Sequence, residues 1–448
     1  MQEFNEKVLE LLEERKFPQL GALLKEMNPA DVAELFEELP RENMALVFRL
    51  LPKELAADAF AYMTPDEQTV LIEKFSDKEL HDVISELYLD DAVDMIEEMP
   101  ANLVRRILRH VDEETRRSIN QILNYPKDSA GSIMTMEYVD LRRGMTVEEA
   151  FDRIRATGVE KETVYTCYVT DSRRKLKGIV TVKDLLLAPK DSLVRDIMET
   201  NIISVSTQTD KEEVAAQFDK YDFLAVPVVD NEQRLVGIVT IDDAIDVIQE
   251  EATEDIEMMA AITPTDRPYM KTGVLETWKK RIPWLLILMI SSTLTGSIIS
   301  SFEDALAATV VLTGFIPMLM GTGGNAAGQS SVSIIRGLSL GEIEYRDVPK
   351  IIWKEFRVAF LCGIALAVVN FVKLMLWDRL SVEVAFVVCS AMVLTVIVAK
   401  VVGCSLPVLA KRVGFDPAVM ANPFITTIVD ALSLLIYFQI ACAVLHIG

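Results

Sequence analysis

A single carboxylate lies in the middle of an apolar stretch that is long enough to cross a membrane. Residues 421–447, ANPFITTIVDALSLLIYFQIACAVLHI, contain one acidic residue, Asp430, and begin with the helix-breaking pair Asn422-Pro423. A spanning helix needs about 20 residues, and a charge at its centre costs at least about 2.5 kcal/mol. Asp430 is therefore either a cation ligand in a pathway or a protonated or paired group that holds helices together. We expect the first.

Further carboxylates occur at helical spacing in the preceding part of the chain. The segment IDDAIDVIQEEATEDIEMMA (241–260) carries Asp243, Asp246, Glu250, Glu251, Glu254, Asp255 and Glu257. Such a density of carboxylates suits Mg²⁺ or Ca²⁺, held loosely and partly through water, and the spacing is not that of an EF-hand. Asp90 and Asp94 stand four residues apart on one predicted helix face, where like charges repel unless a cation neutralises them. A solvated acidic face is the alternative.

The charge is divided unevenly along the 448 residues. From Lys271 onward there are 14 basic and 11 acidic residues, so 31 of the 45 basic and 57 of the 68 acidic residues come earlier, a net of −26. An acidic half thus precedes a nearly neutral apolar half. This distribution argues against nucleic acid and anionic lipid as partners of the first half and favours cations.

The remaining residue types exclude several classes of protein. The five cysteines form no CxxC pair and lie in apolar or strand-like segments, and the three histidines are scattered, which argues against a disulfide or zinc framework. No catalytic triad or ATPase motif is present, so we predict that the chain is not an enzyme. The charged, amphipathic N-terminus lacks the apolar core of a signal peptide, which places the first half in the cytosol.

Residues 1–127 carry a repeat of short helices. Turn-like or helix-starting residues recur every 12 positions, at Asn28, Pro40, Pro52, Thr64, Ser76, Tyr88, Pro100 and Asp112. TPDE (64–67) and SDKE (76–79) fit the capping box. The pattern predicts a helical superhelix in which each short helix buries its apolar face on its neighbours.

Residues 128–256 contain an internal duplication. RRKLKGIVTVKDLLL (173–187) matches NEQRLVGIVTIDDAIDVI (231–248), and each copy is preceded by an Ile-Met opening. Each copy is predicted to be helix, strand, strand, helix. The twin GIVT strands resemble a pair of CBS domains, an α/β module that pairs, often dimerises and often senses adenine nucleotides. That resemblance makes Asp184 and Phe223 candidates for binding ATP, with a dimerisation scaffold as the alternative.

The rest of the chain is predicted to connect to a membrane and cross it. Residues 257–281 form a connector that breaks at Pro264 or Pro268, and residues 282–448 contain five apolar runs: 282–301, 305–335, 356–377, 382–410 and 421–447. Glycines and prolines predict breaks in the second and fourth runs. The basic loops fall on one side, which puts the N-terminus inside the cell and the C-terminus outside.

Two motifs give the chain a wider resemblance. The chain resembles the MgtE family of Mg²⁺ channels or transporters in two motifs, PxxMGTGGNAAGQ (317–329) and DPAxxANPxxTTxxDxxxLxxY (416–437). It also resembles that family in the order of its parts: N domain, CBS pair, connecting plug helix and five-helix transmembrane domain. The resemblance implies a homodimer in the cell membrane, with the pore on the two-fold axis and Asp430 of each copy facing its mate.

The same resemblance implies regulatory Mg²⁺ sites. They comprise Asp90 and Asp94 in the N domain, and Asp222, Asp243, Asp246, Glu251, Glu254 and Asp255 in the CBS pair and connector. Asp416, at the expected mouth of the pore, also matches a Mg²⁺ site of the family. Asp58 is a further candidate ligand, at a position where members of the family carry Glu. Ser132, Thr166 and Lys183 depart from the residues that relatives have.

We therefore expect a multi-pass protein that takes up Mg²⁺ and is closed by cytosolic Mg²⁺ bound to its acidic half. The alternatives are a transporter of another divalent ion such as Co²⁺ or Mn²⁺, a membrane-anchored CBS nucleotide sensor, and an intramembrane enzyme. The oxygen-only ligands near Asp430 favour the harder ion, Mg²⁺.

Overall fold

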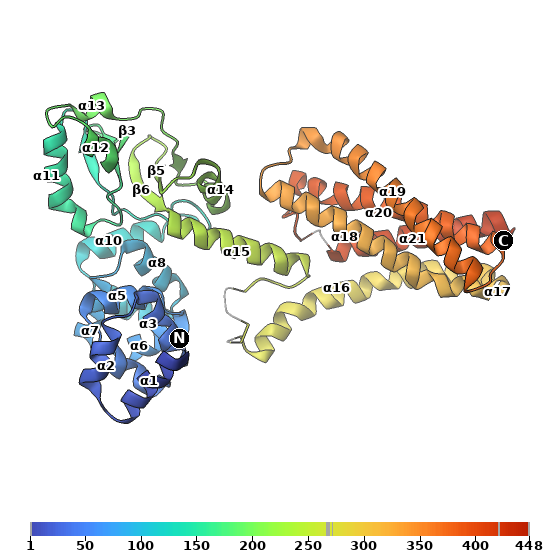
Figure 1. Cartoon of the computed structure of the whole chain (residues 1–448), viewed down its shortest axis with the longest axis horizontal. Coiled ribbons are helices and arrows are strands. Elements are labelled where there is room, and N and C mark those ends of the chain that lie inside the picture. The colour runs from blue at the N-terminus through green and yellow to red at the C-terminus, as the bar shows by residue number, and fades with distance from the viewer. Residues whose placement is uncertain (1, 266–268, 271, 420–421, 447–448) are drawn as a thin grey trace. The chain divides into compact units, whose positions relative to one another are not determined.

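The computed structural model describes residues 2–265, 269–270, 272–419 and 422–446, and the chain divides into the units Met1–Ile248 and Gln249–Gly448. The predicted break at Pro268, the residue Ala421 and the C-terminal end of the fifth apolar run lie outside the described residues. Figure 1 labels many of the elements of both units.

Short helices fill the first part of the chain, as the twelve-residue repeat predicted. They are α1 (Gln2–Glu13), α2 (Phe17–Leu24), α3 (Pro29–Glu38), α4 (Arg41–Phe48), α5 (Lys53–Ala61), α6 (Pro65–Lys74), α7 (Asp77–Ile84), α8 (Leu89–Glu98), α9 (Ala101–His110) and α10 (Glu113–Ile122). Each predicted start residue from Asn28 to Asp112 is the N-cap of one of the helices α3 to α10. Both predicted capping boxes, at Thr64 and Ser76, are present.

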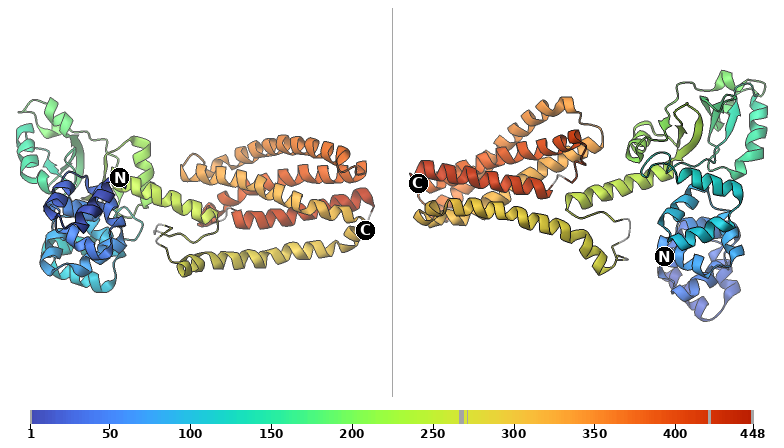
Figure 2. Two further views of the ribbon diagram at one scale, coloured as in Figure 1. Left: turned by 60° about the horizontal axis from the view of Figure 1, so that its bottom comes forward. Right: turned by 180° about the vertical axis from the view of Figure 1, so that it is seen from behind.

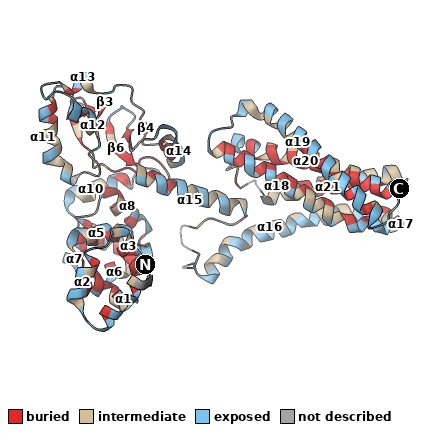
Figure 3. Cartoon of the chain, in the orientation of Figure 1, coloured by how far each residue is buried: buried red, intermediate tan, exposed pale blue. Residues whose placement is uncertain are grey.

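The helices of the N domain share one continuous apolar core. Phe36, Phe48 and Phe60 recur at the twelve-residue interval and contact each other edge to face, with ring centroids 6.2 and 6.0 Å apart. The same core extends from Val8 to Ile122, and Figure 3 shows it as the buried inner faces of these helices. Stacking of amphipathic helices therefore provides the burial that no single ten-residue helix could achieve alone.

Two small sheets follow, one from each copy of the duplication. The first copy contains β1 (Asp140–Arg142), α11 (Val147–Thr157), the 3₁₀ turn η1 (Gly158–Glu160), β2 (Thr166–Thr170), β3 (Leu176–Thr181) and α12 (Val182–Leu187); after α13 (Val194–Ile197), the second contains β4 (Val205–Ser206), α14 (Lys211–Tyr221), β5 (Ala225–Val229) and β6 (Leu235–Thr240). The strand orders β1-β2-β3 and β4-β5-β6 are the same. In each sheet the first pair is parallel and the second antiparallel.

The glycine of each GIVT strand lies beneath the methionine of an Ile-Met opening. A Cβ on Gly178 would meet Met198 Sδ at 2.6 Å, and a Cβ on Gly237 would meet Met134 Sδ at 2.6 Å. Met134 opens the first copy yet packs on the second copy's sheet, and Met198 opens the second copy yet packs on the first copy's sheet. This reciprocal exchange explains both repeated motifs and joins the two copies into one module.

The acidic residues of the segment 241–260 lie on one helix that runs into the connector predicted at 257–281. Helix α15 (Ile241–Met259) continues directly from β6, so most of it falls within the expected CBS region. It ends before Pro264, and the chain becomes helical again at Val274, within the predicted segment 274–278. Lys280 Nζ donates to the backbone oxygen of Pro264 at 2.9 Å and ties the connector to the first long apolar helix.

Five helices of the described chain are long and apolar enough to cross a membrane, in agreement with the five predicted runs. The elements of this region are α16 (Val274–Ser301), α17 (Glu303–Ala308), η2 (Val310–Phe315), α18 (Ile316–Ser339), η3 (Tyr345–Asp347), α19 (Val348–Leu376), α20 (Val382–Val413) and α21 (Asn422–Leu445). Figure 2 shows the long helices running side by side in both views. Helices α18, α20 and α21 hold most of the buried side chains, whereas α16 has none among its described residues.

The second run is interrupted as predicted, although not at its glycines, and the predicted break in the fourth run is wrong. Helix α18 is continuous from Ile316 through GTGGN, because Pro317 stands in its first turn, where a missing N–H costs nothing. The interruption precedes it, at α17 and η2. Helix α20 also continues past Pro407. The glycines serve packing instead, since a Cβ on Gly403 would collide with the backbone of Ala327.

Candidate cation pathway and regulatory sites

Asp430 lines a polar cavity between α18 and α21. The cavity has a volume of about 340 Å³ and is lined by Met320, Gly321, Gly324 and Asn325 of α18 and by Thr426 and Asp430 of α21. Thr426 stands one turn before Asp430 on the same face of α21. The Oδ1 atom of Asp430 is buried without a hydrogen-bond partner among the described residues. Asp430 thus contributes a carboxylate to the cavity wall, and its Oδ1 atom is not compensated by a donor among the described residues.

Small residues allow α18 to approach the helices that carry and support Asp430. A Cβ on Gly323 would lie 2.9 Å from Ser433 Oγ and from Thr395 Cγ2, and a Cβ on Gly324 would lie 3.3 Å from Thr426 Cγ2. The glycine-rich motif thus sets the width of the cavity. Sequence reasoning assigned GTGGN to a break and did not identify Asn325 or Thr426 as site residues.

The size and the lining of the cavity suit a hydrated divalent cation. Six waters at about 30 Å³ each occupy roughly 180 Å³, which fits inside the cavity of about 340 Å³. Mg²⁺ keeps several of its waters and is commonly held through one or two carboxylates. A carboxylate, an amide and a hydroxyl can accept hydrogen bonds from, or donate them to, such a water shell.

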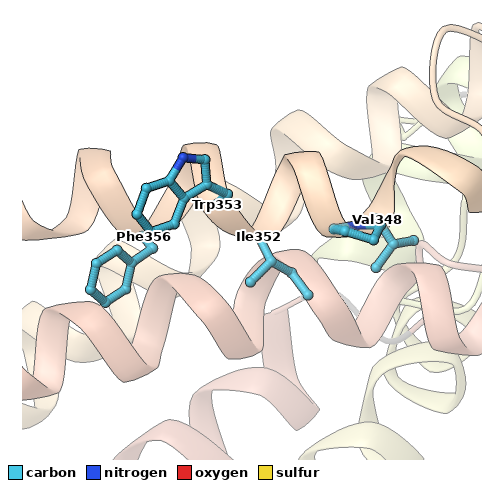
Figure 4. A pocket seen from close by; sticks show the side chains of 5 residues that line it. Val348, Ile352, Trp353 and Phe356 are labelled. Carbon is cyan, nitrogen blue, oxygen red and sulfur yellow. The ribbon is translucent and has the colours of Figure 1, made fainter.

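A second hollow, on α19, has a different chemistry. Its volume is about 470 Å³, and Val348, Pro349, Ile352, Trp353 and Phe356 line it (Figure 4). Trp353 and Phe356 stack with ring centroids 5.7 Å apart. Such an aromatic, apolar surface near the start of a spanning helix suits the membrane interface and lipid rather than a hydrated ion.

The end of α15 meets the end of α18. Ser339 Oγ donates a hydrogen bond of 3.2 Å to Asp255 Oδ2, and Met258 and Met259 pack against Ile335 and Ala418. Burial raises the pKa of Asp255, and the nearby charge of Asp416 adds to that rise. Two of the predicted metal residues, Asp255 and Asp416, are therefore neighbours beside the helix that lines the cavity.

In the first unit, carboxylates from the N domain and the CBS pair come together. The predicted residues Asp58, Asp90, Asp243 and Asp246 lie in this cluster, together with Asp91, Glu162 and Asp242, which the sequence did not single out. Asp90 is 8% exposed. Asp243 also accepts a hydrogen bond of 2.7 Å from Thr240 Oγ1. We call these seven residues the acidic cluster.

The members of the acidic cluster oppose each other's ionisation. Burial raises the pKa of Asp91 to about 6, and the charges of Asp242 and Asp58 add to the effect. Burial raises the pKa of Glu162 to about 8 and that of Asp243 to about 7, again with neighbouring carboxylates contributing. The pKa of Asp90 is raised well above its ordinary value for the same reasons. At neutral pH the cluster therefore favours a bound proton or a bound cation.

The remaining predicted ligands differ in their exposure. Asp94 is exposed on α8, Asp222 is an exposed left-handed residue with φ 54° at the end of α14, and Glu251 and Glu254 are partly buried on α15. Among the described residues, no group of three His, Cys, Asp or Glu side chains is arranged to hold a bare metal ion. The coupled carboxylates are thus near neighbours, without forming a closed coordination shell.

The two nucleotide candidates have local structural partners. Thr181 is the N-cap of α12 and Asp184 completes its capping box: Asp184 N donates to Thr181 Oγ1 at 3.1 Å, and Thr181 N donates to Asp184 Oδ2 at 3.2 Å. Phe223 stacks on Tyr221 with centroids 5.4 Å apart. An aromatic pair of this kind also offers a surface on which an adenine could stack.

A carboxylate that lines a cavity large enough for a hydrated ion, in a five-helix apolar bundle preceded by acidic domains, defines a membrane transport protein for cations. The comparisons with known proteins agree. Residues 316–440 match the MgtE divalent cation transporter family, residues 27–128 match the MgtE intracellular N domain, and residues 130–191 and 194–250 match the CBS domain. The chain belongs to the MgtE family. It is a multi-pass membrane protein with an intracellular N domain, and membership of a transporter family confirms that it is not an enzyme.

Relatives match over almost the whole length. The magnesium transporter MgtE of Thermus thermophilus is 38% identical over 436 residues, 96% of each chain. That of Bacillus subtilis is 34% identical, covering 98% of this chain and 97% of the relative. A crystal structure of the cytosolic domain of the Mg²⁺ channel MgtE in complex with ATP is 38% identical, covers 54% of this chain and 99% of that one, and has a TM-score of 0.52.

Proposed function

We propose that this protein is a Mg²⁺ channel or transporter that mediates Mg²⁺ uptake and is closed by cytosolic Mg²⁺. The observation that carries the proposal is the cavity at Asp430, whose Oδ1 has no hydrogen-bond partner among the described residues. Its oxygen and amide lining favours Mg²⁺ over softer ions such as Co²⁺. The names of the full-length relatives in Thermus thermophilus and Bacillus subtilis support the same ion.

The working unit would be a homodimer. Mg²⁺ prefers ligands in octahedral arrangement, whereas α18 and α21 supply one wall with one carboxylate. A second copy related by a two-fold axis would supply the opposite wall and a second Asp430. Each copy would have its N-terminus in the cytosol and its C-terminus outside.

Closure would arise from charge neutralisation in the cytosolic half. Two unit charges 4 Å apart repel by about 4 kcal/mol at an effective dielectric of 20. Mg²⁺ bound at the acidic cluster, and near Asp255 and Asp416, would remove such repulsion and favour the compact form. At low Mg²⁺ the uncompensated charges of this half, −26 in net, would loosen it and release the pore.

The transport proposal is tested with purified protein in liposomes that contain a Mg²⁺-sensitive dye. We expect Asp430→Asn to lower the initial rate of Mg²⁺ entry at least about tenfold, because the wall loses its carboxylate charge. Asp378→Asn is the matched control, since Asp378 pairs with Lys373 at 3.2 Å outside the cavity. Equal rates in the wild type and Asp430→Asn would refute the role of Asp430.

The gating proposal is tested by removing charge from the acidic cluster in the full chain. The triple substitution Asp91→Asn, Glu162→Gln and Asp242→Asn should leave Mg²⁺ entry less sensitive to Mg²⁺ on the cytosolic side. The control removes three exposed carboxylates of the N domain, by Glu34→Gln, Glu42→Gln and Glu73→Gln. Unchanged inhibition in the first variant would contradict regulation through the cluster.

A nucleotide is a further proposed ligand of the CBS pair, supported by the ATP complex of the relative's cytosolic domain. Asp184 would contact the ribose, and the ring of Phe223 would lie near the base. Binding of ATP to the full chain by isothermal titration, compared between the wild type and Asp184→Ala, tests this part independently of transport.

A further inference from the structure

Three polar side chains from three helices meet inside the apolar bundle, away from the cavity lining. Lys400 of α20 is 5% exposed. Its Nζ atom donates to Ser330 Oγ of α18 at 3.2 Å and lies 3.7 Å from Glu355 Oε2 of α19. Ser330 Oγ in turn donates to the same Glu355 oxygen at 2.6 Å. We call Lys400, Glu355 and Ser330 the buried triad.

Burying the charges of the triad in an apolar bundle costs free energy unless its members pair with each other. Charged side chains within membrane helices are rare, and those that occur pair with one another and mark function. Glu355 and Lys400 carry opposite charges, and the hydroxyl of Ser330 bridges them. The triad is neutral as a whole, so it introduces no net charge beside a path for cations.

The triad holds the helix that forms the cavity wall. On α18, Gly323, Ala327 and Ser330 lie along one stripe at spacings of four and three residues. Each of them contacts a supporting helix: Gly323 adjoins Thr395 of α20, the backbone of Ala327 adjoins Gly403, and Ser330 binds Lys400. The contacts at Gly323 and Ala327 are van der Waals packing between small residues, which permits a helix to slide. The triad adds a charge-assisted, directional contact in the middle of the bundle, and a second directional contact, from Lys411 Nζ of α20 to Leu338 O at 3.1 Å, lies at the end of α18.

We propose that Lys400, Glu355 and Ser330 are positioning residues for permeation: they fix α18 against α19 and α20 so that Asn325 and the backbone at Gly321 keep their place opposite Asp430. The inference rests on the proposed function, cation passage through that cavity. The triad does not touch the cation. It acts through the position of α18.

This role makes the two charges interdependent. Removal of Glu355 leaves a buried positive charge inside the bundle, and removal of Lys400 leaves a buried negative one. Breaking a buried pair by removing one partner is much more harmful than replacing both by neutral groups. The two substitutions should therefore be strongly non-additive, which a double-mutant cycle measures directly.

The experiment uses the full chain in liposomes and compares Lys400→Met, Glu355→Gln, their combination and Lys400→Arg. The readouts are the initial Mg²⁺ flux per folded protein and the ratio of Mg²⁺ to Ca²⁺ flux. Lys373→Met is the control, because Lys373 forms a half-exposed ion pair with Asp378 at the end of the same α19. Ser330→Ala is the mild variant if a charge variant fails to fold. Its control is Ser331→Ala, since Ser331 Oγ is buried with no hydrogen-bond partner among the described residues.

We expect each single charge variant to lower Mg²⁺ flux about tenfold and to reduce the preference for Mg²⁺, and the combination to recover most of the loss. Lys400→Arg should keep the preference, and Ser330→Ala should reduce it more than Ser331→Ala does. If the charge variants kept the Mg²⁺ flux per folded protein and the preference for Mg²⁺ over Ca²⁺, the triad would contribute only to stability, even if the yield were lower. That result would overturn the inference. So would additive losses. Absence of Mg²⁺ flux in the wild type would overturn the proposed function as well, which separates the two failures.

Discussion

Ser339, the last residue of α18, donates a hydrogen bond of 3.2 Å to Oδ2 of Asp255, close to the end of α15. The bond joins the helix that leaves the CBS pair to the helix that carries the glycine-rich wall of the cavity. Met258 and Met259 pack beside it on Ile335 and Ala418. We therefore expect a change in the position of α15 to move the end of α18.

Ser339→Ala should weaken inhibition by cytosolic Mg²⁺. A hydrogen bond to a charged group contributes about 1.5–3 kcal/mol, and its loss would raise the Mg²⁺ concentration for half-inhibition by roughly tenfold. Ser333→Ala is the control, because Ser333 lies on the same helix and donates to Gln329 O at 2.9 Å, within α18 itself. Flux in liposomes at graded cytosolic Mg²⁺ measures both. Equal half-inhibition in the two variants would show that the Ser339 bond does not take part in closure.

The compact form of the acidic half should loosen as pH rises when Mg²⁺ is absent. Folding raises the pKa of Asp91 to about 6, that of Asp243 to about 7 and that of Glu162 to about 8. A raised carboxyl pKa means that the compact state holds more protons, so its stability is greatest below the unfolded values near pH 4 and is lost as pH rises through about 6 to 8.

Protease protection of the full chain at pH 5.5 and pH 8 measures this effect. Without Mg²⁺ the protein should be cleaved faster at pH 8, and saturating Mg²⁺ should remove most of the difference, because the cation replaces the protons. The variant that lacks Asp91, Glu162 and Asp242 should show a weaker pH dependence. Faster cleavage at pH 5.5 than at pH 8 would contradict the raised pKa values of these carboxyl groups.

Gly237→Ala should destabilise the CBS pair. The added Cβ would lie 2.6 Å from Met134 Sδ and 2.7 Å from Thr135 O, and the second of these atoms is backbone. Overpacking of this kind costs about 1–3 kcal/mol, which corresponds to a fall of several degrees in Tm. Gly144→Ala is the control, since no atom of the described residues lies within 4 Å of its Cβ position. Equal Tm values for Gly237→Ala and Gly144→Ala in a thermal melt would show that Met134 moves aside to make room for the added Cβ.

Local patterns in the sequence predicted the elements well. The twelve-residue interval located the N-caps of α3 to α10, because capping residues and apolar spacing act within a single turn or two. The GIVT repeat located both sheets, and apolar length located all five long helices. The breaks predicted in α18 and α20 were wrong because glycine has two uses: it frees the backbone, and it also permits two helices to approach closely.

Sites assembled from distant segments were harder to predict. Asp90, Asp243 and Asp430 stand out in the sequence, but Asp91 and Glu162 become notable only when the N domain and the CBS pair bring carboxylates together. Glu355 lies just before the predicted third run, 356–377, whereas α19 begins at Val348 and carries Glu355 into the bundle to meet Lys400. The sequence contains these residues, but only tertiary contacts reveal their partners.

Asn325→Leu should reduce Mg²⁺ flux while leaving the fold intact. Asn325 lines the cavity with Asp430, and its amide can both donate to and accept from the waters of a hydrated ion. Leucine has the same branched shape at Cγ and a higher helix propensity, but its side chain has no polar atoms, so the water shell would lose a partner on the wall opposite the carboxylate. The flux should fall about tenfold, the scale of one or two lost hydrogen bonds. Thr322→Val is the control, because Thr322 lies on α18 outside the residues that line the cavity. If Asn325→Leu kept the full Mg²⁺ flux while Asp430→Asn lowered it, the ion would contact only the side chains of α21. The side chain of Asn325 would then not be part of the pathway.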